Sequence, residues 1–267
     1  MEKTILITGS TDGIGLATAK QLAAQGHRVL LHGRSLAKLE AVKEEIAAGG
    51  GTVESYGANL SRMPEVEALA AAVAQAHPRL DVLINNAGVY TTSSPITEDG
   101  LDIRFVVNAI APYRLTQRLV PLLDTSGRVV NLSSAAQSPV NLKALTGQVS
   151  LSDNAAYAQS KLALTAWSRH LALSLGEQGP AIIAVNPGSL LGSKMVKQAF
   201  GIPGGDISIG ADILCRAALS DEFAKASGQY FDNDQGQFAP PHPDALNPQK
   251  AQAIVETIEG ILQRAGR

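Results

Sequence analysis

The side chains best suited to chemistry in this sequence are Tyr157 and Lys161, four positions apart in a stretch of helical character. At that spacing, two side chains lie one turn apart on the same face of a helix. A phenol has a reference pKa of about 10, and a nearby ammonium lowers that pKa because it favours the phenolate. The pair is therefore predicted to act as an acid–base, with Lys161 lowering the pKa of Tyr157. A Y-x-x-x-K pattern also occurs by chance on many helices, so the prediction needs support from the rest of the chain.

Three glycines, Gly9, Gly13 and Gly15, lie between a short apolar run and a segment of helical period. A turn of this kind points backbone N–H groups and the positive end of a helix at a phosphate, and glycines allow its close approach. The sequence therefore predicts a site for a dinucleotide pyrophosphate. The spacing G-x-x-x-G-x-G differs from the G-x-G-x-x-G fingerprint, and a tight structural turn is the alternative.

The second apolar run ends in His32-Gly33-Arg34-Ser35, where a dinucleotide fold meets the adenosine ribose. An acidic residue there accepts hydrogen bonds from a free 2′-hydroxyl, whereas an arginine offers donors to a 2′-phosphate. Because Arg34 is present and the acid is absent, NADP(H) is expected to be preferred over NAD(H). The alternative is that Arg34 is a solvated surface residue.

Short apolar runs alternate with longer Ala/Leu-rich segments, a pattern typical of βαβ units around a parallel sheet. Seven strands are expected, at 5–8, 28–32, 52–56, 82–85, 128–133, 182–186 and 228–231. Helices are expected at 13–25, 36–48, 63–76, 99–123, 154–176, 208–220 and 249–263. Residues 1–267 are therefore predicted to form one α/β domain, a doubly wound Rossmann-type sheet with helices on both faces. The charged stretch from Lys38 to Glu45 is interpreted as a solvated helix face.

Two segments, 135–153 and 188–207, leave from the carboxyl ends of predicted strands, where ligands bind in parallel sheets. They are expected to form walls of the site. Their mostly small and apolar side chains, among them Ala136, Val140, Leu142 and Met195, favour a lipophilic substrate.

Composition excludes several classes of function. The 267 residues are 45% hydrophobic and 17% charged, with a formal net charge of −2 and no block of like charge, so nucleic acid is not an expected partner. The single cysteine and five scattered histidines lack the spacing of metal ligands. With no secretion signal and no apolar stretch of about 18 residues, the protein is expected to be cytoplasmic without a membrane span.

Six motifs in order make the sequence resemble the short-chain dehydrogenase/reductase family over nearly its whole length. They are Thr8-Gly-x-x-x-Gly-Ile-Gly15, Asn85-Asn-Ala-Gly88, Asn108, Asn131-Leu-Ser-Ser134, Tyr157-x-x-x-Lys161 and Asn186-Pro-Gly188. Ser227-Gly-Gln-Tyr-Phe231 looks most like the retinol-dehydrogenase-like branch. The resemblance implies an NADP(H)-dependent oxidoreductase that interconverts a carbonyl and a primary or secondary alcohol on a small molecule.

The resemblance also implies roles for four side chains. Tyr157 would be the general acid in reduction and the general base in oxidation, and Ser134 would hold the same oxygen while Ser133 points elsewhere. Lys161 would also bind the nicotinamide ribose, and Asn108 would anchor a water that relays protons. Pro112 has no N–H, so it leaves the Asn108 carbonyl free for that water, or it merely ends a helical segment.

Cofactor contacts implied by the resemblance extend along the whole chain. They involve Gly9, Ser10, Thr11, Gly13, Ile14, Arg34, Ser35, Asn59, Leu60, Asn86, Ala87, Gly88, Tyr157, Lys161, Pro187, Gly188, Leu190 and Ser193. Asn59 replaces the usual aspartate that accepts from the adenine amino group, which an asparagine carbonyl can still do. Ser193 stands where the family often has threonine.

Other readings remain open. Many relatives form homo-oligomers through helices matching 99–123 and 154–176, but Arg104, Arg114, Arg118 and Arg169 could equally lie on a solvated surface. A serine hydrolase would need a G-x-S-x-G elbow, which the sequence lacks. The main alternative is a non-catalytic redox sensor or partner-binding protein that binds NADP(H) on the same fold. The intact catalytic set favours the enzyme.

Overall fold

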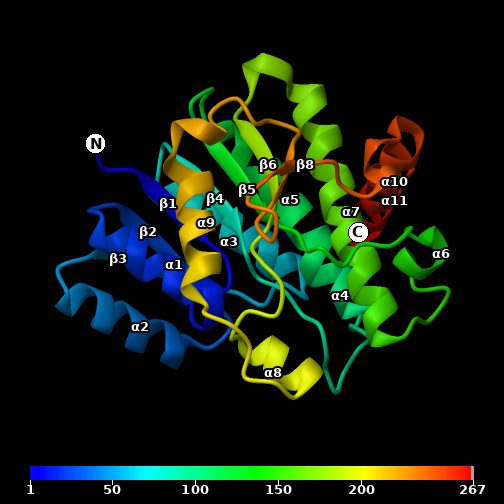
Figure 1. Cartoon of the computed structure of the whole chain (residues 1–267), viewed down its shortest axis with the longest axis horizontal. Coiled ribbons are helices and arrows are strands. Elements are labelled where there is room, and N and C mark those ends of the chain that lie inside the picture. Colours follow the sequence, from blue (N-terminus) through cyan, green and yellow to red (C-terminus); the bar gives the residue numbers. More distant parts are fainter. Residues whose placement is uncertain (266–267) are drawn as a thin grey trace.

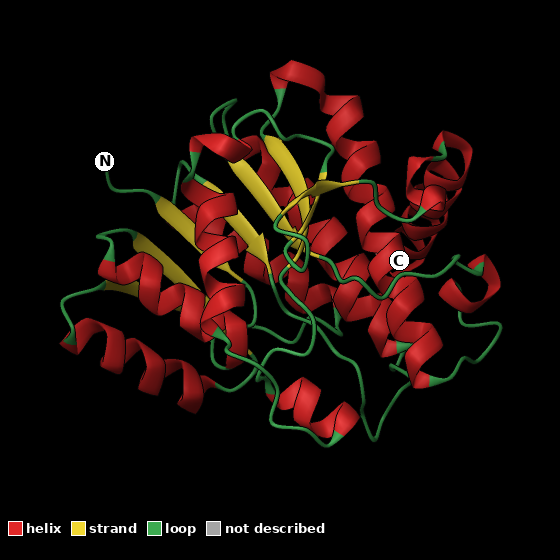
Figure 2. Ribbon diagram, in the orientation of Figure 1, coloured by secondary structure: helices red, strands yellow, loops and turns green. Residues whose placement is uncertain are grey.

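An eight-stranded sheet organises the computed structural model, which describes residues 1–265 (Figures 1 and 2). The strand order is β3-β2-β1-β4-β5-β6-β7-β8, and every pairing is parallel except that of β7 with β8. The strands are β1 Thr4–Ile7, β2 Arg28–Gly33, β3 Thr52–Gly57, β4 Val82–Asn85, β5 Arg128–Leu132, β6 Ala181–Asn186, β7 Tyr230–Asp232 and β8 Gln237–Ala239. The order reverses between β1 and β4, as the doubly wound prediction requires.

Helices cover both faces of this sheet. The α-helices are α1 Gly13–Ala24, α2 Leu36–Ala48, α3 Met63–Ala76, α4 Ile103–Phe105, α5 Ala111–Leu119, α6 Leu142–Leu145, α7 Asp153–Leu175, α8 Lys194–Phe200, α9 Ser208–Leu219, α10 Pro243–Leu246 and α11 Pro248–Ala265. One apolar core joins the sheet to α1, α2 and α9, and the other joins it to α3, α5, α7 and α11. Apolar burial on both faces explains why the central strands are continuous hydrophobic runs.

The predicted strand count of seven is wrong because β8 extends the sheet by one antiparallel strand. Phe238 of β8 pairs with Phe231 of β7, and the two rings lie edge to face at 5.1 Å. Three residues with a single large apolar side chain are too few to give a recognisable period. The fold class is nevertheless as predicted.

The predicted helix at 99–123 is divided rather than continuous. A π-helix, η1 Val106–Ile110, separates α4 from α5, and the short 3₁₀ helix η2 Val120–Leu122 follows α5. Within η1, the N–H of Ala111 donates to the carbonyl of Val106, five positions earlier. Pro112 lacks an N–H, and in a regular helix its ring would clash with the Asn108 carbonyl. The wider turn of the π-helix accommodates Pro112. It lies at Asn108, the residue for which a proton relay was predicted.

Helices α5 and α7 were expected to carry subunit contacts. In this structure α7 packs against α10 and α11 of the same chain, and α5 packs against α3. Tyr113 and Gln117 of α5 both donate to the Glu259 carboxylate of α11. A solvated surface was left open as an alternative for four arginines, and for Arg104 that alternative is wrong because this residue is 1% exposed. Arg114 and Arg118 both form ion pairs with Glu67. Arg169 donates a hydrogen bond to the Gly228 carbonyl.

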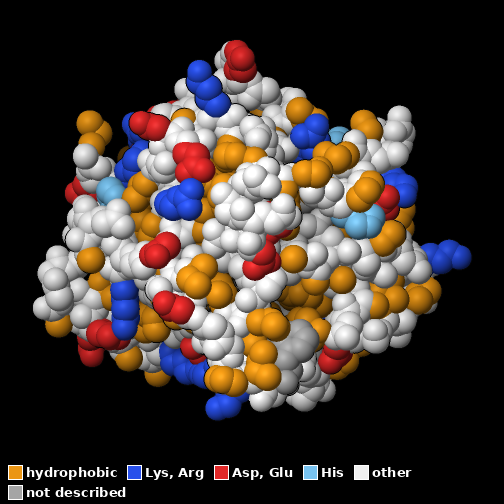
Figure 3. All heavy atoms as spheres, in the orientation of Figure 1, with side chains coloured by type: hydrophobic (Ala, Val, Ile, Leu, Met, Phe, Trp, Pro, Cys, Tyr) orange, Lys and Arg blue, Asp and Glu red, His pale blue; other side chains and the backbone are white. Residues whose placement is uncertain are grey.

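Surface charge is mixed, as the composition predicts. Figure 3 shows acidic and basic side chains interspersed over the visible face, without a broad field of one sign. Within residues 1–265, none of the helices combines the length and apolar character that crossing a bilayer demands.

Candidate active site

A cleft of about 990 Å³ runs across the carboxyl ends of the parallel strands. The segments that follow the six strands from β1 to β6 line it, together with α7 and α8. This is the edge of the sheet at which the predicted site was expected. Of the predicted site residues, all but Ser10, Ser35 and Asn108 line this cleft.

The glycine turn after β1 is built around backbone contacts that tolerate no side chain. Gly9 has a φ of +67°, and a Cβ there would lie 2.9 Å from the Ala87 Cα. A Cβ on Gly15 would lie 2.3 Å from the Gly9 carbonyl oxygen. The Asn86 amide donates to the Thr8 and Gly9 carbonyls at 2.8 and 3.0 Å, which fixes the turn against the end of β4. The N-terminus of α1 thus opens into the cleft, as an anion site requires.

Asp12 and Lys194 add charge beside this turn. Asp12 caps α1 by accepting from Gly13 N–H, and the Lys194 ammonium lies 2.7 Å from its carboxylate. The hydrogen bond from Lys194 is the largest cause of the lowered pKa of Asp12. Lys194 belongs to α8, so this ion pair links the glycine turn to the opposite wall of the cleft. This pairing across 182 positions could not be predicted from sequence, because Asp12 occupies a variable position of the glycine motif and Lys194 lies outside every motif.

His32 braces the same turn from inside the protein. Its Nδ1 accepts from the Gly9 N–H at 3.1 Å, and its Nε2 lies 3.1 Å from the Ala58 carbonyl oxygen. Because a carbonyl only accepts, the neutral ring carries its proton on Nε2. Burial lowers the pKa of His32 to about 4, so the ring stays neutral and keeps its acceptor for the glycine turn.

Because His32 is neutral in the folded protein, we expect the free energy of unfolding to fall in mild acid. The ordinary pKa of 6.5 applies in the unfolded chain, so between pH 6.5 and about 4 unfolding takes up a proton and the free energy of unfolding falls as pH falls. We expect His32→Asn, which keeps an acceptor near Gly9, to reduce that slope in urea titrations. His27→Asn is the comparison: burial also lowers the pKa of His27, but His27 is less buried than His32, so this variant should reduce the slope by less. An unchanged slope in His32→Asn contradicts the assignment.

At the end of the cleft where the sequence predicts the adenosine, Arg34 is exposed at the end of β2 and is one of the lining residues. Among the ion pairs found within residues 1–265, none includes Arg34. Lys38, interpreted from sequence as part of a solvated helix face, lines the same end. Two cations therefore face this end of the cleft.

Three predicted cofactor residues have other partners. Ser10 is buried and its hydroxyl accepts from His32 N–H at 2.9 Å, and Ser35 caps α2 by accepting from Lys38 N–H. Asn59 lines the cleft, but its Oδ1 already accepts from the Ser61 N–H and hydroxyl at 3.1 and 2.9 Å. With both lone pairs engaged, this oxygen is not placed to accept from an adenine amino group, contrary to the expectation.

The opposite end of the cleft is shaped by the loop after β6, which contains Pro187, Gly188 and Leu190. Leu190 has a φ of 53°, a left-handed conformation that is costly for a side-chain-bearing residue. Asp234, in the turn between β7 and β8, accepts from the Ser189 N–H and hydroxyl and from the Asn186 amide. These bonds hold the loop in that conformation. Ser193 caps α8 by accepting from Val196 N–H and lines the cleft beyond the loop.

Two hydroxyl-bearing residues of the predicted catalytic set, Tyr157 and Ser134, both line the cleft. Tyr157 is half-buried on α7, and its hydroxyl interacts with that of Ser134 at the end of β5. Neighbouring Ser133 is directed away, with its Oγ 2.6 Å from the Thr165 hydroxyl. A single hydroxyl of the serine pair therefore faces the tyrosine.

The prediction that Lys161 lowers the pKa of Tyr157 is wrong for this structure. Burial raises the pKa of Tyr157 to about 12, although the hydrogen bond with Ser134 acts in the opposite direction. The Lys161 ammonium donates to the Leu132 carbonyl at 2.7 Å and lies 5.6 Å from the centre of the Tyr157 ring. Burial lowers the pKa of Lys161 itself to about 8. Desolvation dominates both groups, an effect that spacing along a helix does not reveal.

Asn108 lies beneath the cleft and is 1% exposed. Its amide donates to the Val89 carbonyl and the Ser160 hydroxyl, both at 2.9 Å, and its Oδ1 accepts from Val89 N–H at 2.7 Å. The side chain thus joins the loop after β4 to α7, close to Lys161. A Cβ on Gly88 would lie 3.5 Å from Asn108 Oδ1 and 3.7 Å from Lys161 Nζ, so these groups share one small region.

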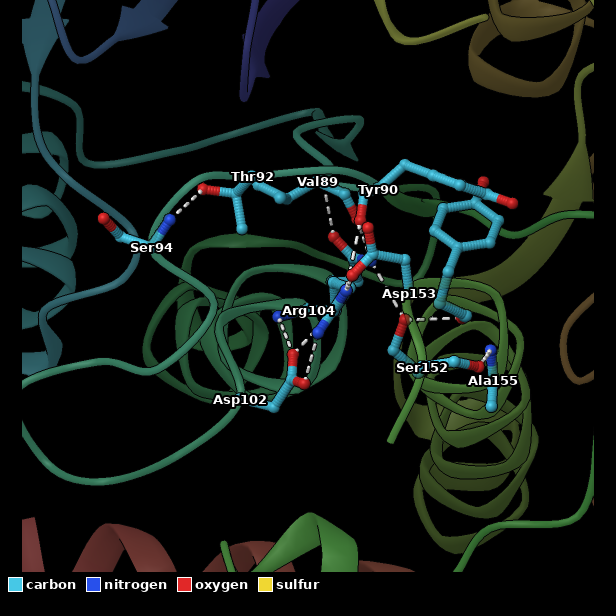
Figure 4. Close-up of polar contacts among 12 residues, drawn as sticks. Val89, Tyr90, Thr92, Ser94, Asp102, Arg104, Ser152, Asp153 and Ala155 are labelled. Carbon is cyan, nitrogen blue, oxygen red and sulfur yellow. Dashed lines mark hydrogen bonds and ion pairs between the residues drawn. The ribbon is translucent and has the colours of Figure 1, made fainter. Parts of the chain in front are cut away.

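Two functional candidates were missed from sequence, Tyr90 and Arg104. The Tyr90 ring lies 4.6 Å from that of Tyr157, measured between centroids. Figure 4 shows Arg104 directed at Asp102 and Asp153, beside the backbone of Tyr90. The sequence signal for Tyr90 was an aromatic residue two positions after the Asn-Asn-Ala-Gly motif, and a single aromatic residue does not indicate a specific function.

The expected wall at 135–153 is largely wrong. Within that segment the cleft is lined by Ala135 and Ala136, whereas Val140 packs into the core and α6 contacts α11. Within 188–207, the lining residues are Gly188, Ser189, Leu190, Leu191, Ser193, Lys194, Met195, Val196 and Gln198. Over the described chain, no group of three or more His, Cys, Asp or Glu side chains is arranged to hold a metal ion.

Comparisons with known proteins agree with this geometry. A family model described as short chain dehydrogenase matches residues 3–201. Retinol dehydrogenase 13 of Homo sapiens is 31% identical over 253 residues, which is 86% of this chain and 76% of that protein. Retinol dehydrogenase 12 of Mus musculus is 34% identical over 244 residues, with 86% and 77% covered.

Solved structures extend the similarity to the fold. A protein from Mycobacterium Paratuberculosis, described as putative and uncharacterized, matches with a TM-score of 0.81 and 28% identity over 98% of this chain and 93% of that one. The landomycin C-6 ketoreductase LanV, solved with bound NADP and rabelomycin, matches with a TM-score of 0.70 and 29% identity over 88% and 95%.

Proposed function

The chain belongs to the short-chain dehydrogenase family of CH–OH/C=O oxidoreductases, and from that premise we propose that it interconverts a small lipophilic carbonyl compound and its alcohol with NADP(H). The observation that carries the proposal is one cleft with a glycine turn and two cations at one end and the Tyr157–Ser134 hydroxyl pair further along. The glycine turn and the cations suit a phosphorylated dinucleotide, and the hydroxyl pair suits the reacting oxygen of a substrate.

The fit of a nicotinamide cofactor is supported by the turn itself. Side chains at Gly9 or Gly15 would collide with backbone atoms, and the N-terminus of α1 faces the space left open. Arg34 supports NADP(H) over NAD(H), because its guanidinium can form paired hydrogen bonds with a 2′-phosphate. When bound, the cofactor supplies or accepts the hydride. Ser10, Ser35 and the Asn59 oxygen are left out of the proposed contacts, for the reasons given above.

The chain's own residues then handle the proton. In reduction, the Tyr157 hydroxyl donates its proton to the carbonyl oxygen, and the Ser134 hydroxyl stabilises negative charge developing there. With a pKa of about 8, Lys161 Nζ can release and regain a proton near neutral pH. We assign Lys161 to restoring the tyrosine proton, with Asn108 holding the adjoining relay. Oxidation runs the same steps in reverse.

The substrate class is inferred from the side chains that line the cleft holding Tyr157. The apolar lining of the cleft as a whole includes Val89, Ile103, Val107, Leu191, Met195 and Val196. Such a wall favours a hydrocarbon body over a sugar or an amino acid, because burying unpaired polar groups is costly. The cytoplasmic location and the absence of a nucleic-acid partner remain predictions from the sequence.

A graded panel of carbonyl compounds tests the proposed function. We expect NADPH oxidation, followed by absorbance, with aliphatic and aromatic aldehydes and ketones, and far less with hydroxylated sugars of equal size. NADH is the matched cofactor control. No turnover with any compound, together with partner binding that depends on NADPH, would support the non-catalytic sensor instead.

A further inference from the structure

We propose that Tyr90 is a positioning residue for Tyr157 and that the buried Arg104 holds it in place by joining three separate segments. The inference rests on the proposed function, because it concerns the hydroxyl assigned to proton transfer. It adds two residues from outside every motif of the sequence. Neither is a catalytic residue in this account, since each acts through Tyr157.

Tyr90 meets Tyr157 through its ring and meets α7 through its hydroxyl. The two ring centroids are 4.6 Å apart and the rings are inclined by 46°. The Tyr90 hydroxyl donates to Asn154 Oδ1, which lies three residues before Tyr157 on α7. Ring and hydroxyl therefore contact adjacent turns of one helix. A tyrosine side chain held against a second ring has fewer rotamers available, so its hydroxyl stays directed at Ser134.

Tyr90 itself lies in the loop between β4 and α4 and needs an anchor. Arg104 provides this anchor by contacting the backbone of Tyr90: the Arg104 Nη1 lies 3.5 Å from the Tyr90 carbonyl oxygen. The same Nη1 donates to the Asp153 carboxylate, which stands one turn before Tyr157 on α7. One guanidinium thus connects the Tyr90 loop to the first turn of the helix that carries Tyr157 (Figure 4).

The remaining donors of Arg104 fix the guanidinium. Nε and Nη2 donate to the two oxygens of Asp102 at 2.8 and 2.6 Å, a bidentate arrangement. The side chain of Arg104 is 2% exposed, and that of Asp102 is 11% exposed. Any arrangement that separated Arg104 from Asp102 would leave a buried charge unpaired, which is costly. The guanidinium is therefore held in this one position. Because α4 leads directly into the π-helix of Asn108, the brace also fixes the entry to the proposed relay.

If the contacts of Arg104 and Tyr90 served folding alone, a different result would be expected. Its loss would lower stability and leave turnover by the folded protein unchanged. A positioning role requires kcat to fall while NADPH affinity stays the same, because Tyr90 lies beyond the turn that binds the cofactor phosphates. Effects of about tenfold to a hundredfold on kcat are expected when a reacting group is displaced by roughly 1 Å.

The test compares matched variants for kcat, NADPH affinity and thermal midpoint. We expect Tyr90→Leu to lower kcat about tenfold or more, and Tyr90→Phe, which keeps the ring, to retain most of the activity. Tyr113→Leu is the control, because Tyr113 also packs against an aromatic ring, at 5.4 Å from Trp167, but away from the cleft. It should lower stability without lowering kcat. Unchanged kcat in Tyr90→Leu overturns the proposal.

The anchor is tested in parallel with Arg104→Met against Arg128→Met, a second buried arginine outside the cleft. Both should lose stability, and kcat should fall in Arg104→Met alone. Asp153→Ala removes one arm of the network from a partly exposed position, so it remains informative if Arg104→Met does not fold. An equal kcat in Asp153→Ala and the parent contradicts the role of the anchor.

A readout without turnover separates this proposal from the proposed function. With ¹³C-labelled tyrosine, the ring signals of Tyr157 are identified by their loss in Tyr157→Phe. We expect restricted ring motion in the parent and averaged signals in Tyr90→Leu. If Tyr157 signals respond but no carbonyl is reduced, the proposed function fails alone. If carbonyls are reduced and the Tyr157 signals are unchanged in Tyr90→Leu, the Tyr90 proposal fails alone.

Discussion

Replacing Tyr157 by phenylalanine should lower kcat for carbonyl reduction by about 10²- to 10⁴-fold, the usual contribution of general acid catalysis. The variant loses one hydroxyl and keeps the ring against Tyr90, so the cleft retains its shape. The missing proton donor leaves Ser134 facing the reacting oxygen alone. NADPH affinity should change little, because the glycine turn and Arg34 are untouched.

Steady-state kinetics and a fluorescence titration with NADPH measure the two quantities separately. Tyr113→Phe is the matched control, since it also removes one phenolic hydroxyl, the one that donates to Glu259. That variant should turn over at the rate of the parent. If Tyr157→Phe reduces the same substrate at a comparable rate, Tyr157 is not the acid–base.

Arg34→Ala should weaken NADPH binding by about tenfold to a hundredfold, since hydrogen bonds to charged groups contribute about 1.5–3 kcal/mol. NADH binding should remain nearly constant because its ribose carries no 2′-phosphate. Lys38→Ala should produce a smaller change in the same direction, since an ammonium is a point charge without the paired donors of arginine. Raised ionic strength should weaken NADPH binding by the parent more than by Arg34→Ala.

Titrations of both cofactors against parent and variants give the ratio of dissociation constants directly. Arg79→Ala serves as the control, because Arg79 is exposed and lies outside the cleft. Equal affinities of the parent for NADPH and NADH, or an unchanged ratio in Arg34→Ala, would remove the basis for NADP(H) preference.

Local sequence pattern was sufficient for the fold class and most of the cleft. Hydrophobic runs located the central strands because both faces of a parallel sheet are buried, and motif order placed Gly9, Ser134 and Tyr157 at the same edge. The family resemblance read from those motifs is confirmed by the family model and the retinol dehydrogenase relatives. The short strand β8 and the break at η1 were missed, because neither spans enough residues to show a period.

Contacts between distant positions could not be predicted from pattern. Asp234 holds the loop at Ser189 across 45 positions, and Arg104 reaches Asp153 across 49. The raised pKa of Tyr157 has the same origin, since the desolvation that causes it comes from packing in three dimensions. Spacing placed Lys161 on the correct helix face, whereas the hydrogen bond to Leu132 that directs its ammonium required the structure.

Transfer of a labelled hydride tests the central claim most directly. NADPH carrying deuterium at both hydrogen positions of the nicotinamide C4 is supplied with the best carbonyl substrate from the panel, and the alcohol is analysed by mass spectrometry and NMR. The account predicts one deuterium on the carbinol carbon, and a hydroxyl proton derived from solvent. An alcohol without deuterium at that carbon, or NADPH consumption without alcohol, would contradict hydride transfer in this cleft.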